Sequence, residues 1–586
     1  MVISGRLAAD VRRFPSGCSG LLEVDRVEAR GVEGRTELQL PECPAPLLQG
    51  WRVQATGVLR RPLPAVHPLL PGSAERLARQ GSWSQLRAES IEVLQRPWTP
   101  LADLRRDVAQ RLQQAVGPRR GGFLAALVLG SAQVQLPEDI RAAFRMAGLS
   151  HALAASGFHL SVLLGSVLML ARRWPPGLRL PLAATALLLF LCLAGAQPSV
   201  VRAVLMAAMA LLIREAGHHS RPVGVLLLTL SGMLLLRPAW ALSIGFQLSA
   251  AATAGLIFTA PRLERLVQAW LPDRWQGLAA ALSIPLAALL WTLPLQLLHF
   301  GAMPLYALPA NLLVAPLLVP LTLLAMLSAL LVLVGPPAVL PLLLWPVHQL
   351  AGLVITMASW ISHWPGAQLL TGRPQAWVVA LLVLGILPWL LRAAPCRRRL
   401  SLIPMATALL VHGLVQFGDG LVAVERFGRH WLLARHLGRA ALVSTHGDAR
   451  SCRMAKKLAA VHGHARLDWV MLLDPVATDV LSCWQELAHR VEASQQGQSP
   501  LAIGQVLRST GLSVQRLQQR SGALVMRVGR QRWQLFPSPQ ALWTLQDQQR
   551  SGSQQVFAGI WLGFKPSKPQ RRWLLEHGAG SRVVGL

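Results

Sequence analysis

From Trp275 to Gly372 the chain contains no Asp, Glu, Lys or Arg. A water-soluble domain of this length would need charged side chains on its surface, whereas helices in hydrocarbon exclude them. Across the whole chain only 14% of residues are charged, and the mean hydropathy is +0.41. The sequence therefore predicts a polytopic membrane protein, and its 586 residues leave room for further domains.

Ten apolar stretches are each roughly long enough to cross the hydrocarbon core of a bilayer. The predicted spans are 148–171, 179–197, 199–215, 222–237, 239–260, 277–299, 304–334, 337–362, 375–392 and 400–416. The seventh is interrupted by Pro304, Pro309, Pro316 and Pro320. It predicts a discontinuous or re-entrant helix, because broken backbone at membrane depth is tolerated where it lines a cavity.

Arginines are concentrated in alternate loops between these spans. Twelve follow the odd-numbered spans, whereas the other loops hold only Arg237 and Arg373. Cytoplasmic loops carry the positive excess. We therefore expect a multi-pass protein of the bacterial inner (plasma) membrane whose N-terminal and C-terminal soluble domains are both extracytoplasmic. This inference depends on the seventh span crossing the membrane once, because a miscount there would reverse the side assigned to every later loop.

Residues 1–97 have the pattern of a small β domain. Strand-like runs occupy Ser19–Ala29, Trp51–Leu59 and Ile91–Leu94, and 73–80 could form one helix. Five strands and a helix would fit an OB-like barrel, a fold often used on single strands. Its contact with nucleic acid is left open, because few aromatic side chains are available to stack on bases. They are Phe14, Trp51, Trp83 and Trp98.

Residues 98–147 predict amphipathic or interfacial helices. The first begins at Thr99 and Pro100 and could lie on a membrane surface or pack against the barrel, and two further short helices near 122–132 and 137–147 lead into the membrane. Residues 417–586 predict a soluble, mixed α/β domain. Its strand-like runs are Leu421–Glu425, Ala441–Ser444 and Trp469–Leu473, its helix-like stretches are 451–462 and 480–493, and Ser494–Ser499 is expected to be a polar, mobile loop.

The formal net charge of +30 suits a polyanion or an anionic lipid surface, but cytoplasmic loops and a codon bias toward Arg explain it equally well. The six cysteines show no CxxC and no zinc-type spacing. In an extracytoplasmic domain Cys18 and Cys43 could form a disulfide, although chance placement is an equal alternative. Met1 leads directly into strand-like sequence, so no signal peptide is predicted.

Polar side chains interrupt the predicted spans. His151 and His159 lie eight residues apart, about two helical turns, which is too far to share one metal ion. Arg202 is the one charge not assigned to a loop; it could meet a phosphate bidentately or extend toward the interface. Gln247, Ser249 and Asn311 could form hydrogen bonds that hold neighbouring helices together. Together with Arg202 they suggest a polar path, and there are no paired intramembrane carboxylates for a proton relay.

Five blocks in order resemble the competence-domain motifs of the ComEC-type competence proteins. They are Phe144–His159, Ala194–Ala203, Gly245–Ser249, Thr292–Leu295 with Phe300 and Gly301, and Asn311 with Pro316. The resemblance covers about 120–335 and implies a channel that imports single-stranded transforming DNA across the inner membrane. The N-terminal barrel resembles the family's OB-type domain, whereas the hydrophobic segments that usually precede it are missing, through truncation or because this branch lacks them.

The resemblance also implies partners. They are single-stranded DNA, membrane lipid, an extracytoplasmic DNA receptor and a cytoplasmic DNA-translocating motor, with oligomerisation left open. The candidate DNA path consists of His151, Ser156, His159, Arg202, Gln247 and Asn311.

Family members often end in a metallo-β-lactamase-like domain with a His-x-Asp-x-Asp-His ligand run after a strand. Here the corresponding positions are Asp474, Val476, Thr478 and Asp479. Valine cannot bind a metal and threonine is a poor ligand. We therefore predict a degenerate, non-catalytic domain with no metal and no cofactor. Two alternatives remain: a membrane-tethered, metal-dependent nuclease acting on incoming DNA, and an unrelated small-solute transporter.

Overall fold

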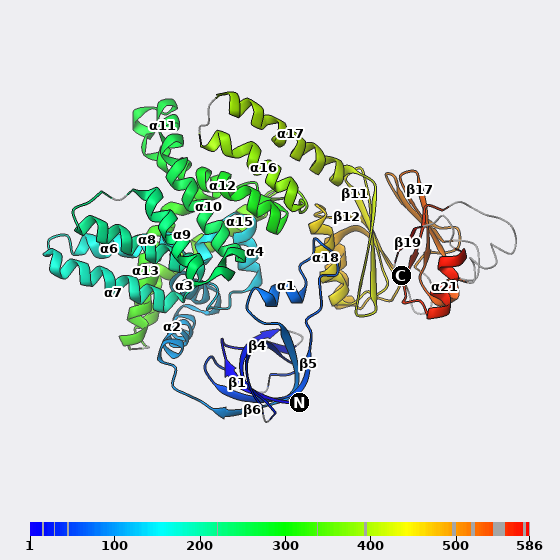
Figure 1. Cartoon of the computed structure of the whole chain (residues 1–586), viewed down its shortest axis with the longest axis horizontal. Helices are drawn as coiled ribbons and strands as arrows, with labels where there is room; N and C mark the ends of the chain where they lie inside the picture. The colour runs from blue at the N-terminus through cyan, green and yellow to red at the C-terminus, as the bar shows by residue number, and fades with distance from the viewer. Residues whose placement is uncertain are drawn as a thin grey trace. The chain divides into compact units, whose positions relative to one another are not determined.

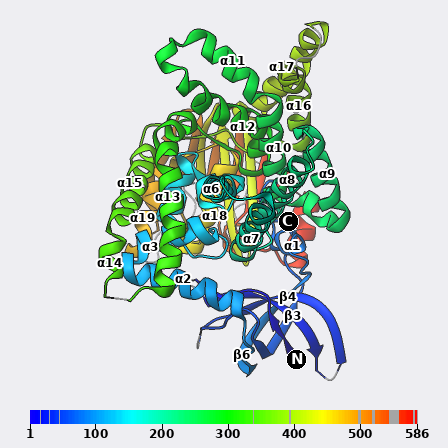
Figure 2. The same ribbon diagram turned by 90° about the vertical axis from the view of Figure 1, so that its left-hand side faces the viewer.

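The structure is a computed structural model that describes residues 1–14, 17–28, 30–43, 46–219, 221–336, 338–391, 395–494, 500–516, 522–542, 557–577 and 582–584 (Figures 1 and 2). The chain is multi-domain and forms two units. The first comprises Met1–Pro64, Ser73–Leu295 and Met303–Leu369; the second comprises Ala65–Gly72, Gln296–Ala302 and Leu370–Leu586. Apart from Ser494, the predicted loop 494–499 lies outside the described residues.

The N-terminal part of the first unit is a closed β structure. Its elements are β1 (Val2–Leu7), β2 (Arg12–Phe14), β3 (Gly17–Val27), β4 (Arg30–Leu40), β5 (Arg52–Arg60), α1 (Ser73–Ala78) and β6 (Ser84–Gln95). The strand order is β1-β5-β6-β4-β3-β2, and the additional pairing of β1 with β3 closes five of the strands into a ring. Figure 1 shows this ring in blue. The predicted strands and helix correspond to β3, β5, β6 and α1.

Two glycines let this ring close. The β1–β3 register shifts next to Gly5, and the β5–β6 register shifts next to Gly57. A Cβ atom at either position would lie 2.2 Å from a backbone oxygen of the neighbouring strand, Glu23 O or Arg87 O. β-Bulges of this kind bend a strand and increase its twist, which a small closed sheet requires. The apolar interior includes Ile3, Leu7, Leu22, Leu38, Val53 and Leu86.

Helices make up the rest of the first unit. They are α2 (Pro100–Val116), α3 (Pro118–Leu129), α4 (Glu138–Met146), α5 (Ser150–Leu153), α6 (Gly157–Leu170), α7 (Pro176–Ala194), α8 (Pro198–Glu215), α9 (Pro222–Leu236), η1 (Pro238–Leu242), α10 (Ile244–Phe258), α11 (Ala260–Trp270), η2 (Asp273–Trp275), α12 (Gly277–Phe300), α13 (Ala307–Val334), α14 (Leu340–Leu343) and α15 (Trp345–Ser362). Between them lie short strands β7 (Ala302–Pro304) and, after α15, β8 (Gln368–Leu370).

Helix length and composition show which segments could span a membrane. Among the described residues, four helices qualify, Gly177–Ala194, Gly277–Phe300, Ala307–Val334 and Cys396–Phe417. A fifth qualifies if α10 and α11, which bend by 49° where they meet, form one broken span. All ten predicted spans coincide with helices, but the others, such as α6 and α9, are shorter or more polar than this criterion requires.

The seventh predicted span is one continuous helix, so the expected break there was wrong. Residues of α13 run unbroken from Ala307 to Val334 and include Pro316 and Pro320 inside the helix. In an apolar bundle, neighbouring helices and local adjustments compensate the hydrogen bonds that proline removes. The chain breaks instead between α5 and α6, where Ala154 is extended.

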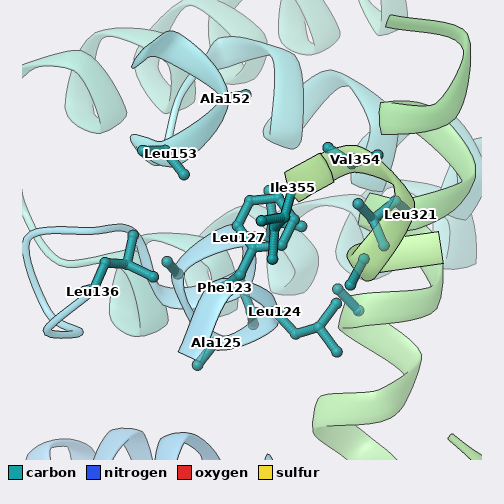
Figure 3. Close-up of a cluster of buried hydrophobic side chains, with 14 of the residues drawn as sticks. Phe123, Leu124, Ala125, Leu127, Leu136, Ala152, Leu153, Leu321, Val354 and Ile355 are labelled. Atoms are coloured by element: carbon teal, nitrogen blue, oxygen red, sulfur yellow. The ribbon is translucent and has the colours of Figure 1, made fainter. Parts of the chain in front are cut away.

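The centre of the helical region is α3, a helix of only 12 residues. Every residue from Gly121 to Leu129 is buried. Figure 3 shows Phe123 and Leu127 of α3 packed among side chains of α13 and α15, such as Leu321 and Ile355. Because α3 is apolar on all sides, it is a core element that the surrounding longer helices enclose.

The described part of the second unit begins with two apolar helices, which are followed by two packed sheets with further helices on their outer faces. Helices α16 (Ala376–Leu390) and α17 (Pro395–Phe417) precede β9 (Gly420–Arg426), β10 (Arg429–His436), β11 (Arg439–Ser444), α18 (Ala449–Val461), β12 (Leu467–Leu472), α19 (Thr478–Leu487) and β13 (Ala488–Ala493). The remaining elements are β14 (Val506–Ser509), β15 (Leu512–Arg516), β16 (Leu524–Val528), β17 (Gln531–Phe536), η3 (Pro539–Leu542), β18 (Gly559–Leu562), α21 (Lys568–His577) and β19 (Arg582–Val584).

These elements stack as four layers. One sheet has the order β13-β12-β11-β10-β9 and the other β14-β15-β16-β17-β18-β19. An apolar cluster that includes Trp469, Met526 and Trp533 joins the two sheets. The outer face of the first sheet packs on α18 and α19, and part of the outer face of the second packs on η3 and α21.

The predicted helix over 480–493 was too long. α19 ends at Leu487, and Ala488–Ala493 form strand β13, which pairs in parallel with β12. Sheet hydrogen bonds to β12 decide the conformation of this short, weakly patterned stretch, as tertiary context often does for marginal propensities.

Each soluble β region holds one disulfide. Cys18 pairs with Cys43 across a Cα–Cα distance of 5.9 Å, the pairing that the sequence had left open. Cys452 of α18 pairs with Cys483 of α19 at 6.4 Å, a pairing that the sequence did not predict. Cys192 and Cys396 are free.

Candidate functional site

The break between α5 and α6 leaves the start of α6 open. Ser156 precedes α6 in an extended conformation, with φ −142° and ψ 172°. Its Oγ lies 3.1 Å from Nδ1 of His159, one turn into the helix. The His159 side chain is buried, and its Nε2 has no partner among the described residues. The first turn of a helix presents unpaired backbone N–H groups and the positive end of the helix dipole.

A second helix begins beside this break. α7 ends at Ala194, and Gly195 takes a positive φ of 81° before α8 starts at Pro198. Ser199, in the first turn of α8, donates its hydroxyl to Ala155 O across 3.4 Å. Two helix N-termini therefore meet here, and we call the residues around them, 154–159 and 197–202, the α6–α8 junction.

Arg202 is the charged group of this junction. Its residue is only 7% exposed, Nε donates to Ser249 Oγ of α10 at 2.8 Å, and Nη1 lies 3.2 Å from Met206 Sδ. A Cβ atom placed on Gly157 would lie 3.7 Å from Arg202 Nη2, so this side of the guanidinium faces the first turn of α6. Among the described residues, no carboxylate forms an ion pair with Arg202.

This arrangement favours an anion. A buried guanidinium without a counter-ion is unfavourable unless it meets water or a negatively charged group. Helix N-termini bind phosphate and carboxylate through backbone N–H groups, and guanidinium adds a bidentate donor. Discontinuous membrane helices use the same device for anionic substrates.

The structure brings together three of the six predicted path residues, Ser156, His159 and Arg202. The side chain of His151 on α5 is exposed. Gln247 donates to Ala241 O at 2.8 Å, and Asn311 donates to Ala307 O of its own helix at 2.6 Å. Neither of these bonds reaches Arg202.

Ser249 was one of the polar side chains that suggested a path, but Gln247 of the same Gly245–Ser249 block was named in the six-residue candidate DNA path in its place. Residues two apart on a helix point about 200° apart, so only one of these two polar side chains can face α8. Sequence identifies the block but cannot tell which of its polar side chains meets Arg202.

A second polar site lies at one end of the C-terminal sandwich. A cavity of about 400 Å³ is lined by Arg429, His446, Gly447, Asp448, Asp474, Pro475, Ala477, Asp479 and Val480. Asp474 and Asp479, two of the predicted ligand positions, therefore line it, whereas Thr478 begins α19. Within the described part of the chain, no group of three or more His, Cys, Asp or Glu side chains is arranged to hold a metal ion.

The two basic side chains of this pocket face its own carboxylates, and acidic groups are in excess, because Asp448, Asp474 and Asp479 all line it. Arg429 Nη2 lies 2.7 Å from Asp448 Oδ2, and His446 Nε2 lies 3.8 Å from Asp474 Oδ2. Asp448 also caps α18 by accepting from Ser451 N at 2.9 Å. Burial opposes ionisation of Asp448, but the hydrogen bonds from Arg429 and Ser451 outweigh it and lower its pKa to about 2.

Comparison with known proteins shows which family the segment around the α6–α8 junction resembles. A model of the competence protein family matches residues 127–395, which include the whole α6–α8 junction. ComE operon protein 3 of Bacillus subtilis (strain 168) is 27% identical over 277 residues. Residues 127–395 therefore carry a competence-family domain, and the chain is similar to ComEC-type competence proteins over this segment. The competence-family match and the long apolar helices together indicate a membrane protein.

The relatives are longer than the matched region. The alignment with ComE operon protein 3 covers 46% of this chain and 34% of the relative. The protein named YcaI of Escherichia coli (strain K12), described as uncharacterized, is 26% identical over 310 residues, which cover 47% of this chain and 40% of YcaI. The matched part of the chain therefore spans well under half of the length of these two relatives. No solved structure matches.

Proposed function

We propose that this protein conducts single-stranded transforming DNA across the inner membrane, and that the α6–α8 junction is a phosphate-binding point on the path. The observation that carries the proposal is Arg202, a buried guanidinium that no carboxylate of the described residues pairs with, beside two helix N-termini inside the competence-family segment. DNA phosphates supply the anion that this geometry lacks, and contacts at one point must stay weak enough to release the strand.

The same proposal assigns roles to the soluble parts. The ring order β1-β3-β4-β6-β5, with β4 parallel to β6, supports an OB-type barrel that receives the strand. The four-layer α/β/β/α stack supports a metallo-β-lactamase-like domain. We propose that this domain does not act as a metal-dependent nuclease, because Val476 and Thr478 stand where the ligand run requires carboxylate donors or histidine.

The disulfides support extracytoplasmic soluble domains. Such bonds persist in oxidising compartments and are rare in the cytosol. One bond lies in the barrel and the other joins α18 to α19, while the free Cys192 and Cys396 lie at the apolar helices. We therefore propose that both β regions are extracytoplasmic, with ten membrane spans between them. We further propose that an extracytoplasmic receptor delivers DNA to the path and that a cytoplasmic motor pulls the strand through it.

The test is the variant Arg202→Gln, expressed in place of the natural protein. Removing one partner of a buried charge contact costs about 2–5 kcal/mol, so transformation should fall by at least about thirtyfold. The measurement is transformation frequency together with cytoplasmic uptake of labelled DNA. Arg172→Gln, which removes an exposed arginine after α6, is the matched control and should transform normally.

Two outcomes contradict the proposal. Normal transformation by an Arg202→Gln variant present in the membrane at its usual level would remove the junction from the path. Normal uptake after deletion of the whole gene would favour a small-solute transporter instead. For the C-terminal domain, stoichiometric zinc or manganese in the purified full-length protein would support the nuclease.

A further inference from the structure

The two sheets of the C-terminal sandwich differ in charge. Residues 418–493, which contain the first sheet, hold ten Lys and Arg and eight acidic residues. Residues 494–586, which contain the second, hold twelve Lys and Arg and only two acidic residues, a net charge of +10. The positive charge of this domain therefore belongs almost entirely to the half built around β14–β19.

Strand register collects part of this charge into a row. Arg508 of β14 is opposite Ser513 of β15, Ser513 is opposite Arg527 of β16, and Arg527 is opposite Arg532 of β17. Residues directly opposite one another in a sheet point to the same face. All three arginines are exposed, and we call Arg508, Arg527 and Arg532 the arginine row.

The face that carries the row is the outer one. Trp533, which follows Arg532, points inward to the core between the sheets, so Arg532 points outward. At its other end the same outer face is apolar, with Phe536 and Ile560 packed under Leu574 of α21. The row lies near the turns at Gly511 and Gly529, which approach His436, whereas the polar pocket lies at the opposite end beside Thr445 and Asp448.

Nothing in the described chain neutralises the row. Arg527 Nε donates to Gly529 O at 3.0 Å, but no described carboxylate forms an ion pair with any of the three arginines. Like charges directly opposite one another destabilise a sheet, and Arg527 and Arg532 are such a pair. A bound polyanion would relieve this repulsion by placing phosphates between the guanidinium groups.

We propose that the arginine row is a docking surface for the phosphate backbone of single-stranded DNA, separate from the polar pocket. The row runs across four strands that are spaced about 4.8 Å apart, so it can follow a linear chain of charges. Surfaces that bind lipid headgroups combine cations with apolar side chains that insert, and the residue between these arginines is Ser513. The proposal rests on the proposed DNA-import function for its ligand but not on the junction.

The test compares two triple variants of the full-length protein in zwitterionic phosphatidylcholine nanodiscs. The first is Arg508→Gln/Arg527→Gln/Arg532→Gln. The matched control, Arg450→Gln/Arg453→Gln/Lys457→Gln, removes the same charge from exposed positions on α18. Binding of fluorescein-labelled oligo(dT) is measured by anisotropy over a range of NaCl concentrations, and circular dichroism checks the fold. The charge-preserving variant with three lysines in the row is measured alongside.

Removing three phosphate contacts should lower the slope of log K against log salt by about 2 and weaken binding about tenfold at low salt. The lysine variant should keep the slope, and the α18 control should match the natural protein. Equal losses in both glutamine variants, or no loss in either, would overturn the proposal. So would unchanged oligo(dT) binding together with lost binding to phosphatidylglycerol vesicles, which would assign the row to the membrane. The Arg202→Gln variant is tested by transformation, whereas the arginine row is tested by oligo(dT) binding. If the transformation test contradicts the proposed import function, the binding test of the row still gives its own answer.

Discussion

The α6–α8 junction and the pocket at the end of the C-terminal sandwich both gather polar side chains, but they handle charge in opposite ways. At the junction, Arg202 is buried, and its side-chain partners among the described residues are a hydroxyl and a thioether. In the pocket, Arg429 is paired with Asp448 and His446 with Asp474. The junction therefore lacks an anion that a substrate could supply, whereas the pocket itself supplies carboxylates to the arginine and the histidine that line it. We expect changes at the junction to affect import and changes around the pocket to affect stability.

The largest effect should come from filling the open side of Arg202. Gly157→Leu extends a branched side chain into the space beside Nη2, and it should reduce transformation as strongly as Arg202→Gln. Gly157→Ala adds only a Cβ atom at an ordinary contact distance of 3.7 Å and should stay close to normal. Transformation frequency is the measurement. Equal transformation by the leucine and alanine variants would show that DNA does not pass beside Nη2 of Arg202. The junction would then no longer differ from the pocket in its effect on import.

The next effect concerns the disulfide beside the pocket. Cys452 and Cys483 lie 31 residues apart, and a loop of that size corresponds to about 3–4 kcal/mol in the chain-entropy account. Cys452→Ser/Cys483→Ser should lower the free energy of unfolding of the second unit by this amount, followed by hydrogen exchange in β10–β12. Cys396→Ser, at a free and exposed cysteine, is the control. If the double variant kept full stability, the α18–α19 contact would not depend on the bond.

Acid should weaken the second unit by a comparable total amount, made up of a smaller contribution from each of two histidines. Burial, with Arg435 nearby, lowers the pKa of His462 to about 3 and that of His464 to about 4. His67 and Asp468 also face this pair. Between pH 6.5 and pH 4 the unfolded chain therefore binds more protons than the folded one, so stability falls as pH falls. From pH 7 to pH 5 the loss is on the order of 2 kcal/mol for each histidine.

Thermal unfolding of the full-length protein at pH 7 and pH 5 measures this loss. His462→Gln/His464→Gln should flatten the dependence, whereas His218→Gln/His219→Gln, at exposed positions of the first unit, should leave it unchanged. A pH dependence that survives the first double variant would assign the acid sensitivity to other groups.

The smallest expected effect is that of Asp448 variants on stability, and it tests directly whether the pocket, unlike the α6–α8 junction, has no role in import. Asp448→Ala removes the N-cap of α18 and should cost about 1 kcal/mol of stability, whereas Asp448→Asn keeps an accepting oxygen and should cost less. Both variants should import DNA normally. A large import defect with unchanged stability would place the pocket on the substrate path, and the contrast with the junction would disappear.

Periodic segments could be predicted from the sequence, and the reason is local. Strands β3, β5 and β12 and helices α2 and α18 follow alternation or helical spacing of apolar residues, which the backbone obeys wherever one face is buried. Where local preference is weak, the prediction failed: Ala488–Ala493 became strand because β12 is beside it. The prolines of α13 led to the wrong prediction of a broken helix for a related reason, because neighbouring helices compensate for the backbone hydrogen bonds that proline removes.

The sequence by itself determined that this is a membrane protein with soluble β regions and that Arg202 is an exceptional charge, because hydrophobicity and charge are properties of the residues themselves. Only the tertiary structure decided that Ser249 contacts Arg202, that Cys452 meets Cys483, and that three arginines from separate strands form one row. These relationships depend on helix rotation and strand register, which packing between distant segments sets and which no single stretch of sequence encodes.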